Sequence, residues 1–183
     1  MIEERVPDKA AETVKAAETV KAAQTAEAAE AVKGAEAEAA DNVVTLGRAA
    51  IEQILPHRQP MLLLDEVTLE EETAHGKYRV RGDEFFVQGH FPGKPIVPGV
   101  ILCEILAQSA CVLLQDSVEE GQLPLYTGID RARFRSPVLP GDTVTTSCRF
   151  TRVKKPFYFV KGEVRVGDRL CVSAEFSFAV SGI

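Results

Sequence analysis

The sequence predicts an α+β domain in which an antiparallel sheet folds around one long buried helix. From about Pro98 to Ser117 the chain is apolar nearly all round over its first two-thirds, which is typical of a buried helix. From Val172 to Val180 apolar residues alternate with Ser and Glu, the pattern of a half-buried strand. Tight-turn sequences, Pro140-Gly141-Asp142 and Gly167-Asp168, separate strand-like segments. One helix among such strands gives the α+β layout.

The first 41 residues are set apart as a low-complexity tail, and residues 42–183 form the predicted domain. Residues 10–33 repeat a six-residue Ala-rich unit four times. Six residues rotate equivalent positions about 120° backward around a helix, so Val14, Val20 and Val32 share no face. We expect a solvated helix or a disordered tail, with a partner-docking helix as the alternative.

The predicted domain begins near Asn42–Thr45. Thr45 is a candidate N-cap for a short helix over Leu46–Ile54, which stops before Pro56. The next apolar run, Met61–Val67, predicts a strand because it ends in charged residues.

A second strand is expected over His75–Arg81 after a turn at Glu71-Glu72. Tyr78 and Val80 then lie on one face of that strand. His75 is interpreted as a surface residue.

Charge and cysteine content exclude several function classes. The net charge is −6, of which the first 41 residues carry −5, so the near-neutral body does not indicate a nucleic-acid partner. The four cysteines show no metal-ligand spacing, and Cys103 and Cys111 are predicted to be small buried residues. No apolar run is long enough to span a bilayer, and no signal-peptide segment is visible. A cytoplasmic protein with reduced thiols and no membrane association is expected.

The segment from Gly89 to Glu104 contains the candidate catalytic residues. It places His90 in a Gly/Pro-rich loop and Glu104 inside the apolar helix that follows. Burying a carboxylate is costly unless it has a use or a partner. A His and a Glu at one site can remove one proton and donate another.

Four segments carry a recognisable motif: Leu55-Pro56-His57-Arg58-Gln59-Pro60-Met61-Leu62-Leu63-Leu64-Asp65, Gly89-His90-Phe91-Pro92-Gly93-Lys94-Pro95-Ile96-Val97-Pro98-Gly99-Val100, Glu104-Ile105-Leu106-Ala107-Gln108 and Phe134-Arg135-Ser136-Pro137-Val138-Leu139-Pro140-Gly141-Asp142. In order and spacing they resemble the FabZ-type 3-hydroxyacyl-[acyl-carrier-protein] dehydratases, and the resemblance extends from about Leu46 to Val180.

This resemblance implies the hot-dog fold, and dimers, often three to a hexamer, with each active site built from two subunits. It implies that His90 is the catalytic histidine and Glu104 the catalytic acid, with the Gly99 amide facing the thioester carbonyl. Glu at position 104 favours FabZ over the FabA-type enzymes, which usually have Asp there and also isomerise the double bond. The implied partner is an acyl carrier protein; no metal or other cofactor is predicted.

The residues suggest how the site would work. His90 removes the C2 proton, Glu104 protonates the leaving hydroxyl, and the unpaired Gly99 and Val100 amides stabilise the thioester oxygen. Gly99 fits because a missing Cβ lets substrate approach closely. Gln108 shares a helix face with Glu104 and is a candidate for substrate binding by orienting the carboxyl or a water, with a satisfied core amide as the alternative.

Further residues are predicted to shape or serve the site. Phe91 and Pro98 are candidates for contact with substrate, while Phe85 and Phe86 line a slot or pack in the core. His57 is predicted to hold its loop, and Asp65 to be a structural hydrogen-bond acceptor. Ten Lys and Arg residues over 131–169 form either a carrier-protein docking surface or an ordinary solvated face.

The leading function is dehydration of (3R)-hydroxyacyl-[acyl-carrier-protein] in the elongation cycle of fatty acid biosynthesis. The alternative enzyme is a bifunctional dehydratase/isomerase of unsaturated fatty acid synthesis. A hot-dog thioesterase fits the His/Glu pattern less well. A catalytically silent carrier-protein-binding module is the alternative from another class.

Overall fold

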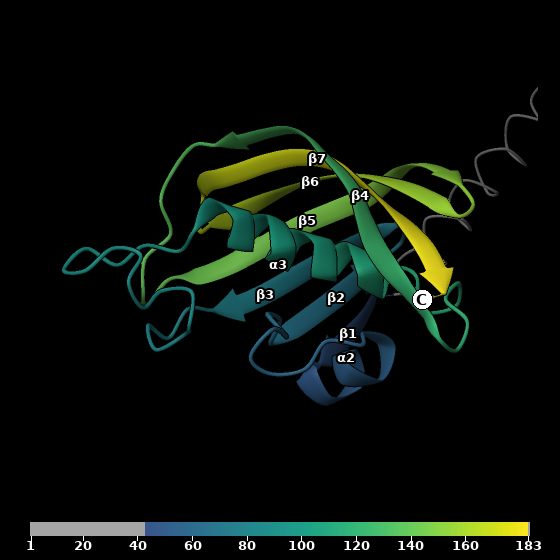
Figure 1. Cartoon of the computed structure of the whole chain (residues 1–183), viewed down its shortest axis with the longest axis horizontal. Helices are drawn as coiled ribbons and strands as arrows, with labels where there is room; N and C mark the ends of the chain where they lie inside the picture. The colour runs from purple at the N-terminus through teal and green to yellow at the C-terminus, as the bar shows by residue number, and fades with distance from the viewer. Residues whose placement is uncertain (1–42, 183) are drawn as a thin grey trace, which may run out of the picture. The chain divides into compact units, whose positions relative to one another are not determined.

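The computed structural model describes residues 43–182. In chain order the elements are β1 (Val43–Gly47), α2 (Arg48–Ile54), β2 (Glu66–Glu70), β3 (Thr73–Arg79), α3 (Gly99–Val112), β4 (Gln122–Phe134), β5 (Thr143–Lys154), β6 (Phe157–Val166) and β7 (Arg169–Gly182). The strands form a seven-stranded sheet in the order β1-β2-β3-β5-β6-β7-β4, antiparallel throughout (Figure 1). The predicted α+β layout is therefore confirmed.

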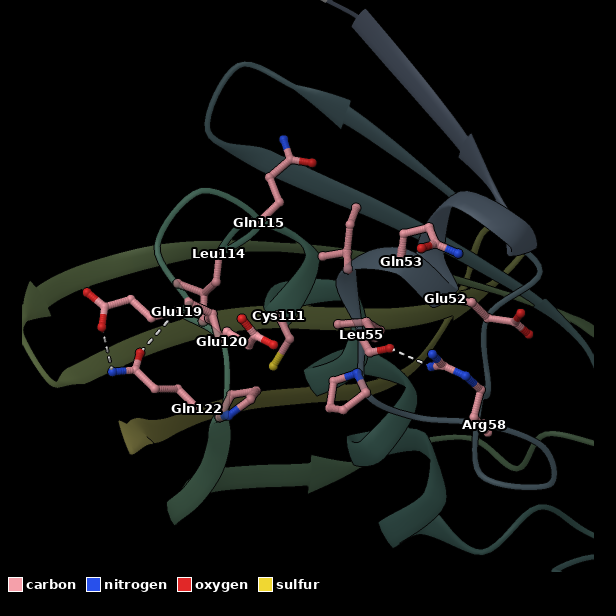
Figure 2. A pocket seen from close by; sticks show the side chains of 14 residues that line it. Glu52, Gln53, Leu55, Arg58, Cys111, Leu114, Gln115, Glu119, Glu120 and Gln122 are labelled. Atoms are coloured by element: carbon pink, nitrogen blue, oxygen red, sulfur yellow. Dashed lines mark hydrogen bonds between the residues drawn. The ribbon is translucent and has the colours of Figure 1, made fainter. Parts of the chain in front are cut away.

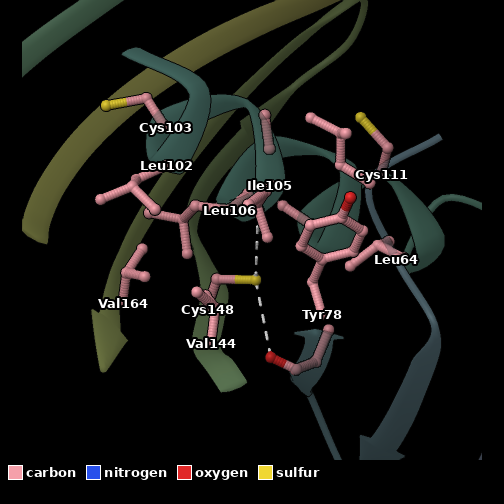
Figure 3. Packing of buried hydrophobic residues seen from close by; sticks show 14 of the residues in the cluster. Leu64, Tyr78, Leu102, Cys103, Ile105, Leu106, Cys111, Val144, Cys148 and Val164 are labelled. Carbon is pink, nitrogen blue, oxygen red and sulfur yellow. Dashed lines mark hydrogen bonds between the residues drawn. The ribbon is translucent and has the colours of Figure 1, made fainter. Parts of the chain in front are cut away.

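The central helix α3 is buried against the sheet, as its composition predicts. It contacts β3, β5, β6 and β7, and Leu106 and Ile105 are fully covered. Figure 3 shows these side chains beside Cys148 of β5, whose Sγ lies 3.6 Å from the Ala74 carbonyl and 3.9 Å from the Leu106 carbonyl. Each fully buried Leu or Ile contributes about 1.5–3 kcal/mol, so this interface fixes where α3 lies.

A buried polar link brings α3 close to the sheet. The Ser109 hydroxyl donates to the Ile105 carbonyl and accepts from Thr146 Oγ1 at 2.8 Å, and Thr146 Oγ1 accepts from the Gly76 amide at 2.9 Å. A Cβ on Gly76 would lie 2.1 Å from Ser109 Oγ. Gly76 is therefore needed for this close approach of helix and strand.

The first elements of the domain differ from the sequence prediction. Thr45 lies in β1 and pairs with Thr68, so it does not cap the helix. The N-cap residue of α2 is Gly47, and no side chain caps this helix. The predicted strand over Met61–Val67 is wrong over residues 61–65. Strand β2 begins only at Glu66, and the Met61 and Leu62 amides bond the Arg58 carbonyl in a turn. Neighbouring turn hydrogen bonds outweigh the strand preference of an apolar run.

Two other boundaries also shift. The strand predicted over His75–Arg81 is β3, two residues earlier at each end; Tyr78 and Val80, predicted to share one face, are both buried, with Val80 just beyond the end of β3. Helix α3 ends at Val112 instead of continuing to Ser117, since the Leu113, Leu114 and Gln115 amides bond carbonyls three residues back. Such tighter turns commonly close a helix.

Other predictions for the described residues are confirmed. The alternating segment 172–180 lies in β7, Gly167-Asp168 joins β6 to β7, and a turn lies at Pro140-Gly141-Asp142. Cys103 and Cys111 are buried.

No helix within residues 43–182 is long and apolar enough to cross a membrane. The tail predicted over residues 1–41 lies outside the described residues.

Candidate active site

A hollow of about 550 Å³ lies at the amino end of α3, and we call it the amino-end hollow. It is lined by His90, Ile96, Val97, Pro98, Gly99, Val100, Leu102, Phe134, Arg135, Ser136 and Pro137. The loop before α3 is held by the Ile96 amide bonding the His90 carbonyl at 2.8 Å and the Val97 amide bonding the Val138 carbonyl at 2.8 Å. Pro98 then starts the helix, because a proline needs no amide partner there.

The His90 ring is oriented by its own loop. Its Nδ1 lies 3.1 Å from the Ile96 carbonyl, so Nδ1 carries the proton and donates. In the neutral ring, this leaves Nε2 unprotonated and able to accept a proton. The exposed Phe91 ring stacks on the His90 ring at a centroid distance of 4.2 Å. Phe91 is thus placed to restrict the motion of the imidazole.

The first turn of α3 offers backbone donors to the same hollow. The Pro98 carbonyl accepts from Ile101 at 3.0 Å and Leu102 at 3.4 Å. Among the described residues, the Gly99 and Val100 amides have no hydrogen-bond acceptor. Unpaired amides at a helix N-terminus attract negative charge. This is the backbone arrangement predicted from the sequence, although its catalytic role stays a prediction.

Phe134, at the end of β4, is a neighbour of Gly99 that the sequence analysis did not identify as a site residue. A Cβ on Gly99 would lie 2.7 Å from two carbons of the Phe134 ring. Within this chain, the missing Cβ of Gly99 therefore makes room for an aromatic ring. The predicted reason, close approach of substrate, is not needed to explain the glycine.

A second hollow, of about 200 Å³, lies midway along α3, and we call it the mid-helix hollow. It is lined by His57, Glu104, Ala107, Gln108, Cys111, Pro124, Leu125, Tyr126 and Phe178. The α3 residues at positions 104, 107, 108 and 111 share one helix face. Tyr126 donates to the Cys103 carbonyl at 3.0 Å, which ties β4 to the helix beside Glu104.

Gln108 fixes the Glu104 carboxyl to the loop before β2. Its Nε2 donates to Glu104 Oε1 at 2.8 Å and to the Met61 carbonyl at 2.7 Å. Its Oε1 accepts from the Leu63 amide at 2.9 Å. These bonds satisfy both ends of an amide that is only 1% exposed. The predicted proximity of Gln108 and Glu104 is thus a direct hydrogen bond.

The environment of Glu104 sets its proton affinity. Burial raises the pKa of Glu104, but contact with His57 and Gln108 outweighs burial and leaves the pKa below its ordinary value. His57 Nε2 lies 3.4 Å from Glu104 Oε1. Further burial of the carboxyl by a bound substrate would raise this pKa again and favour the protonated acid.

The two predicted catalytic side chains lie in different hollows of the chain. The amino-end hollow contains His90, and the mid-helix hollow contains Glu104; the two share no lining residue. Among residues 43–182, no hydrogen bond or ion pair joins these side chains. Within residues 43–182 of one chain, His90 and Glu104 are therefore not brought together, and their pairing in a site built from two subunits stays a prediction.

A third hollow, of about 320 Å³, lies at the carboxyl end of α3 (Figure 2). It shares Cys111 and Pro124 with the mid-helix hollow, so these two residues separate the two spaces. Figure 2 shows Arg58 in its wall, donating to the Leu55 carbonyl at 2.8 Å. This bond ties down the loop that carries His57.

The other candidate residues have separate places. Phe86 is buried, whereas Phe85 is exposed and lies beside a different hollow. Asp65 is the predicted structural acceptor: it accepts from Arg81 and from the Arg79 amide at 2.8 and 2.7 Å. Within the described part of the chain, no group of three or more His, Cys, Asp or Glu side chains has the arrangement of a metal site.

The basic stretch over 131–169 is partly neutralised. Arg131, Arg165 and Arg169 pair with Glu175, Glu163 and Asp142 at 3.2, 3.1 and 3.3 Å. Arg133 and Arg135 are exposed and form no ion pair within residues 43–182. They flank Phe134, and Arg135 lines the amino-end hollow. Positive charge therefore remains beside this hollow.

Comparisons of the sequence with a family model and with known proteins agree on one family. The family model described as a FabA-like domain matches residues 55–175. The chain is 46% identical over 133 residues to the 3-hydroxyacyl-[acyl-carrier-protein] dehydratase FabZ of Macrococcus caseolyticus, which covers 71% of this chain and 92% of that protein. It is 41% identical over 133 residues to the FabZ of Staphylococcus epidermidis, with the same coverage of 71% and 92%.

A solved structure supports the fold independently. The dehydratase heterocomplex ApeI:P from Xenorhabdus doucetiae matches with a TM-score of 0.63 at 18% identity, covering 72% of this chain and 91% of that chain. This likeness confirms the hot-dog fold, with a sheet wrapped around α3. Together with the family match over residues 55–175 and the close sequence relatives, it shows that the chain belongs to the FabA-like domain family and, within it, to the FabZ dehydratases.

Proposed function

We propose that this protein dehydrates (3R)-hydroxyacyl-[acyl-carrier-protein] to the trans-2-enoyl thioester in the elongation cycle of fatty acid biosynthesis. The observation that carries the proposal is the amino-end hollow, where a histidine with a free Nε2 lies beside unpaired helix amides. The FabZ relatives, at 40–46% identity, are named for this reaction.

The reaction follows from these groups. His90 Nε2 takes the C2 proton, and the electron pair left on C2 is delocalised onto the thioester oxygen. The Gly99 and Val100 amides stabilise that oxygen as its charge develops. Glu104 gives its proton to the C3 hydroxyl, which leaves as water while the C2–C3 double bond forms. Acid–base groups of this kind each contribute about 10²–10⁴-fold in rate.

The proposed active unit is a homodimer, with His90 of one subunit facing Glu104 of the partner subunit. The separation of the two hollows within one chain supports this arrangement. The edge strand β4 also exposes Leu125, Ile129 and Phe134. An exposed apolar edge strand favours pairing with another chain. A trimer of such dimers is the proposed larger assembly.

The proposed partner is an acidic acyl carrier protein that presents the thioester. Arg133 and Arg135 beside the amino-end hollow support docking of an acidic surface there. The proposed compartment is the cytoplasm, which the four free, buried cysteines support.

The test gives the purified protein a 3-hydroxyacyl-[acyl-carrier-protein] and follows the product by mass spectrometry. The expected product has lost one water and is the trans-2-enoyl thioester. His90→Ala and Glu104→Gln are expected to be nearly inactive. A cis-3 product would add the isomerase activity, whereas binding without loss of water would support the silent binding module and overturn the proposal.

A further inference from the structure

His57 is a third polar residue in the mid-helix hollow, and the reaction described above does not use it. Its loop is rigid, since Arg58 donates to the Leu55 and His57 carbonyls at 2.8 and 2.7 Å (Figure 2 shows the first bond). The Arg58 carbonyl accepts in turn from the Met61 and Leu62 amides at 2.8 and 3.0 Å. The backbone on both sides of His57 is therefore held in place.

The two donors near Glu104 converge on the same carboxyl oxygen. Gln108 Nε2 lies 2.8 Å from Oε1, and His57 Nε2 lies 3.4 Å from it. Among the described residues, Oε2 has no hydrogen-bond partner. One oxygen is thus occupied by protein groups, and the other is left for a ligand. The His57 distance is long for a hydrogen bond, but such contacts commonly tighten when substrate binds.

The other ring nitrogen of His57 indicates which proton the imidazole carries. Nδ1 is buried and, in the described structure, has no hydrogen-bond partner. A proton on Nδ1 would be a buried donor without an acceptor, which is costlier than an unused lone pair. The neutral ring therefore carries its proton on Nε2, facing Glu104. This is the opposite tautomer to that of His90, whose Nδ1 donates to Ile96.

Other titratable groups around the pair do not compete for this role. Cys103 and Cys111 of α3 and Tyr126 of β4 are near Glu104, and burial raises the pKa of each, so they stay neutral at neutral pH. The Arg58 guanidinium is engaged by backbone carbonyls.

We propose that His57 is a positioning residue. Its Nε2–H and the Gln108 amide together hold Oε1 of Glu104, so that only Oε2 is presented to the substrate's 3-hydroxyl. This proposal rests on the proposed function, because it assigns the hydroxyl as the group that Oε2 meets. It gives His57 and His90 different tasks: one aims the acid, and the other takes the C2 proton.

The experiment compares His57→Ala with His57→Gln, whose amide retains an N–H donor. His57→Ala is expected to lower kcat roughly 100-fold with little change in KM, since a misplaced catalytic group costs about this much. His57→Gln is expected to recover most of the loss. The matched control is His75→Ala, which removes a partly exposed histidine 3.6 Å from Glu70 and leaves kcat unchanged.

A readout besides activity keeps this proposal distinct from the proposed function. Carbon-13 NMR of labelled glutamate, assigned with Glu104→Gln, follows the Glu104 carboxyl in the dimer. Its pKa is expected to rise in His57→Ala, because burial is then opposed by Gln108 alone. If wild type dehydrates nothing, the proposed function fails, while this titration still tests the His57–Glu104 contact.

Three results would overturn the positioning role. The first is an unchanged Glu104 pKa in His57→Ala. The second is a kcat for His57→Gln that is as low as the kcat for His57→Leu. This comparison replaces His57→Ala if that variant does not fold. The third comes from wild type itself: a nitrogen-15 spectrum showing the neutral His57 proton on Nδ1.

Discussion

The amino-end and mid-helix hollows lie along the same helix but are built differently. The amino-end hollow presents backbone amides and a histidine whose Nε2 is free. In the mid-helix hollow, side chains contact one another: Gln108 and His57 both approach Oε1 of Glu104. The first contains a ring nitrogen able to accept a proton and two backbone amides without an acceptor among the described residues, and the second contains a carboxyl whose Oε1 is approached by two side chains.

This difference supports the proposal that each chain contributes complementary halves of a dehydration site. In the proposed mechanism, removal of the C2 proton and stabilisation of the thioester oxygen use only the groups of the amino-end hollow. Protonation of the hydroxyl needs Glu104. Because the two hollows share no lining residue, we propose that the halves of two subunits meet to form each site.

The largest expected effect is complementation between inactive variants. His90→Ala and Glu104→Gln homodimers are each expected to lose roughly 10²–10⁴-fold in kcat. A heterodimer of the two has one site with both residues intact and one with neither. Unfolding and refolding an equimolar mixture should therefore restore about a quarter of wild-type activity, since half of the dimers are mixed.

The control is wild type taken through the same refolding, and sedimentation checks that the mixture is dimeric or larger. If each site were contained in one chain, every site in the mixture would lack one residue. Activity no greater than that of the separate variants would contradict the two-subunit site.

The next effect concerns Gly99 and Phe134. Gly99→Ala is expected to reduce kcat by about 10²–10³-fold, because the new Cβ meets the Phe134 ring and the helix amides must move. The double variant Gly99→Ala/Phe134→Leu should recover part of this loss by relieving the contact. Steady-state kinetics of both variants, with Phe134→Leu as control, provides the measurement. No recovery would mean that the Cβ obstructs the substrate, which is the role that the sequence predicts for Gly99.

Much of the fold could be predicted because it rests on local patterns. The alternation over 172–180 and the Gly167-Asp168 turn specify a hairpin by themselves. The strand prediction over Met61–Val67 failed because an apolar run is equally compatible with a strand and with a buried loop. What decided it was the Arg58 carbonyl, which accepts from two amides that a strand would have used elsewhere.

The site was predictable only where the motif itself carried the signal. His90, Gly99 and Glu104 stand in one continuous segment. Phe134 and His57 come from distant segments, and their neighbours become visible only in the folded chain. The sequence did contain His57 inside a family segment, but spacing could not show that its Nε2 faces a residue 47 positions later.

Gln108 provides a smaller test of how the mid-helix hollow is held. Gln108→Met keeps a similar volume but leaves the Leu63 amide and the Met61 carbonyl without their partner. We expect a loss of about 2–4 kcal/mol in the free energy of unfolding, since each buried unpaired group costs about 1–3 kcal/mol. Urea unfolding measures it. The matched control is Gln115→Met, at an exposed position just beyond α3. Equal effects at both positions would contradict the argument.

The smallest expected effect concerns Asp65. Unlike Glu104, Asp65 accepts hydrogen bonds at both of its carboxylate oxygens. Burial raises the pKa of Asp65, but the Arg79 amide, Arg81 and Arg48 outweigh it and hold the pKa below its ordinary value. A lowered folded pKa adds stability above the unfolded value of about 3.9, and this stability is lost as pH falls through the folded pKa.

Asp65→Asn should therefore cost about 1–2 kcal/mol at pH 7, with the difference from wild type shrinking below about pH 4. Urea unfolding between pH 3 and 7 measures this difference, and Asp168→Asn, at an exposed turn, is the control. A difference that stays constant with pH would mean that Asp65 acts through shape and not through charge. Activity per folded molecule should stay near wild type, because Asp65 has no oxygen left to offer a substrate. Glu104 differs in that one respect: among the described residues its Oε2 has no hydrogen-bond partner, which supports its proposed role as the acid.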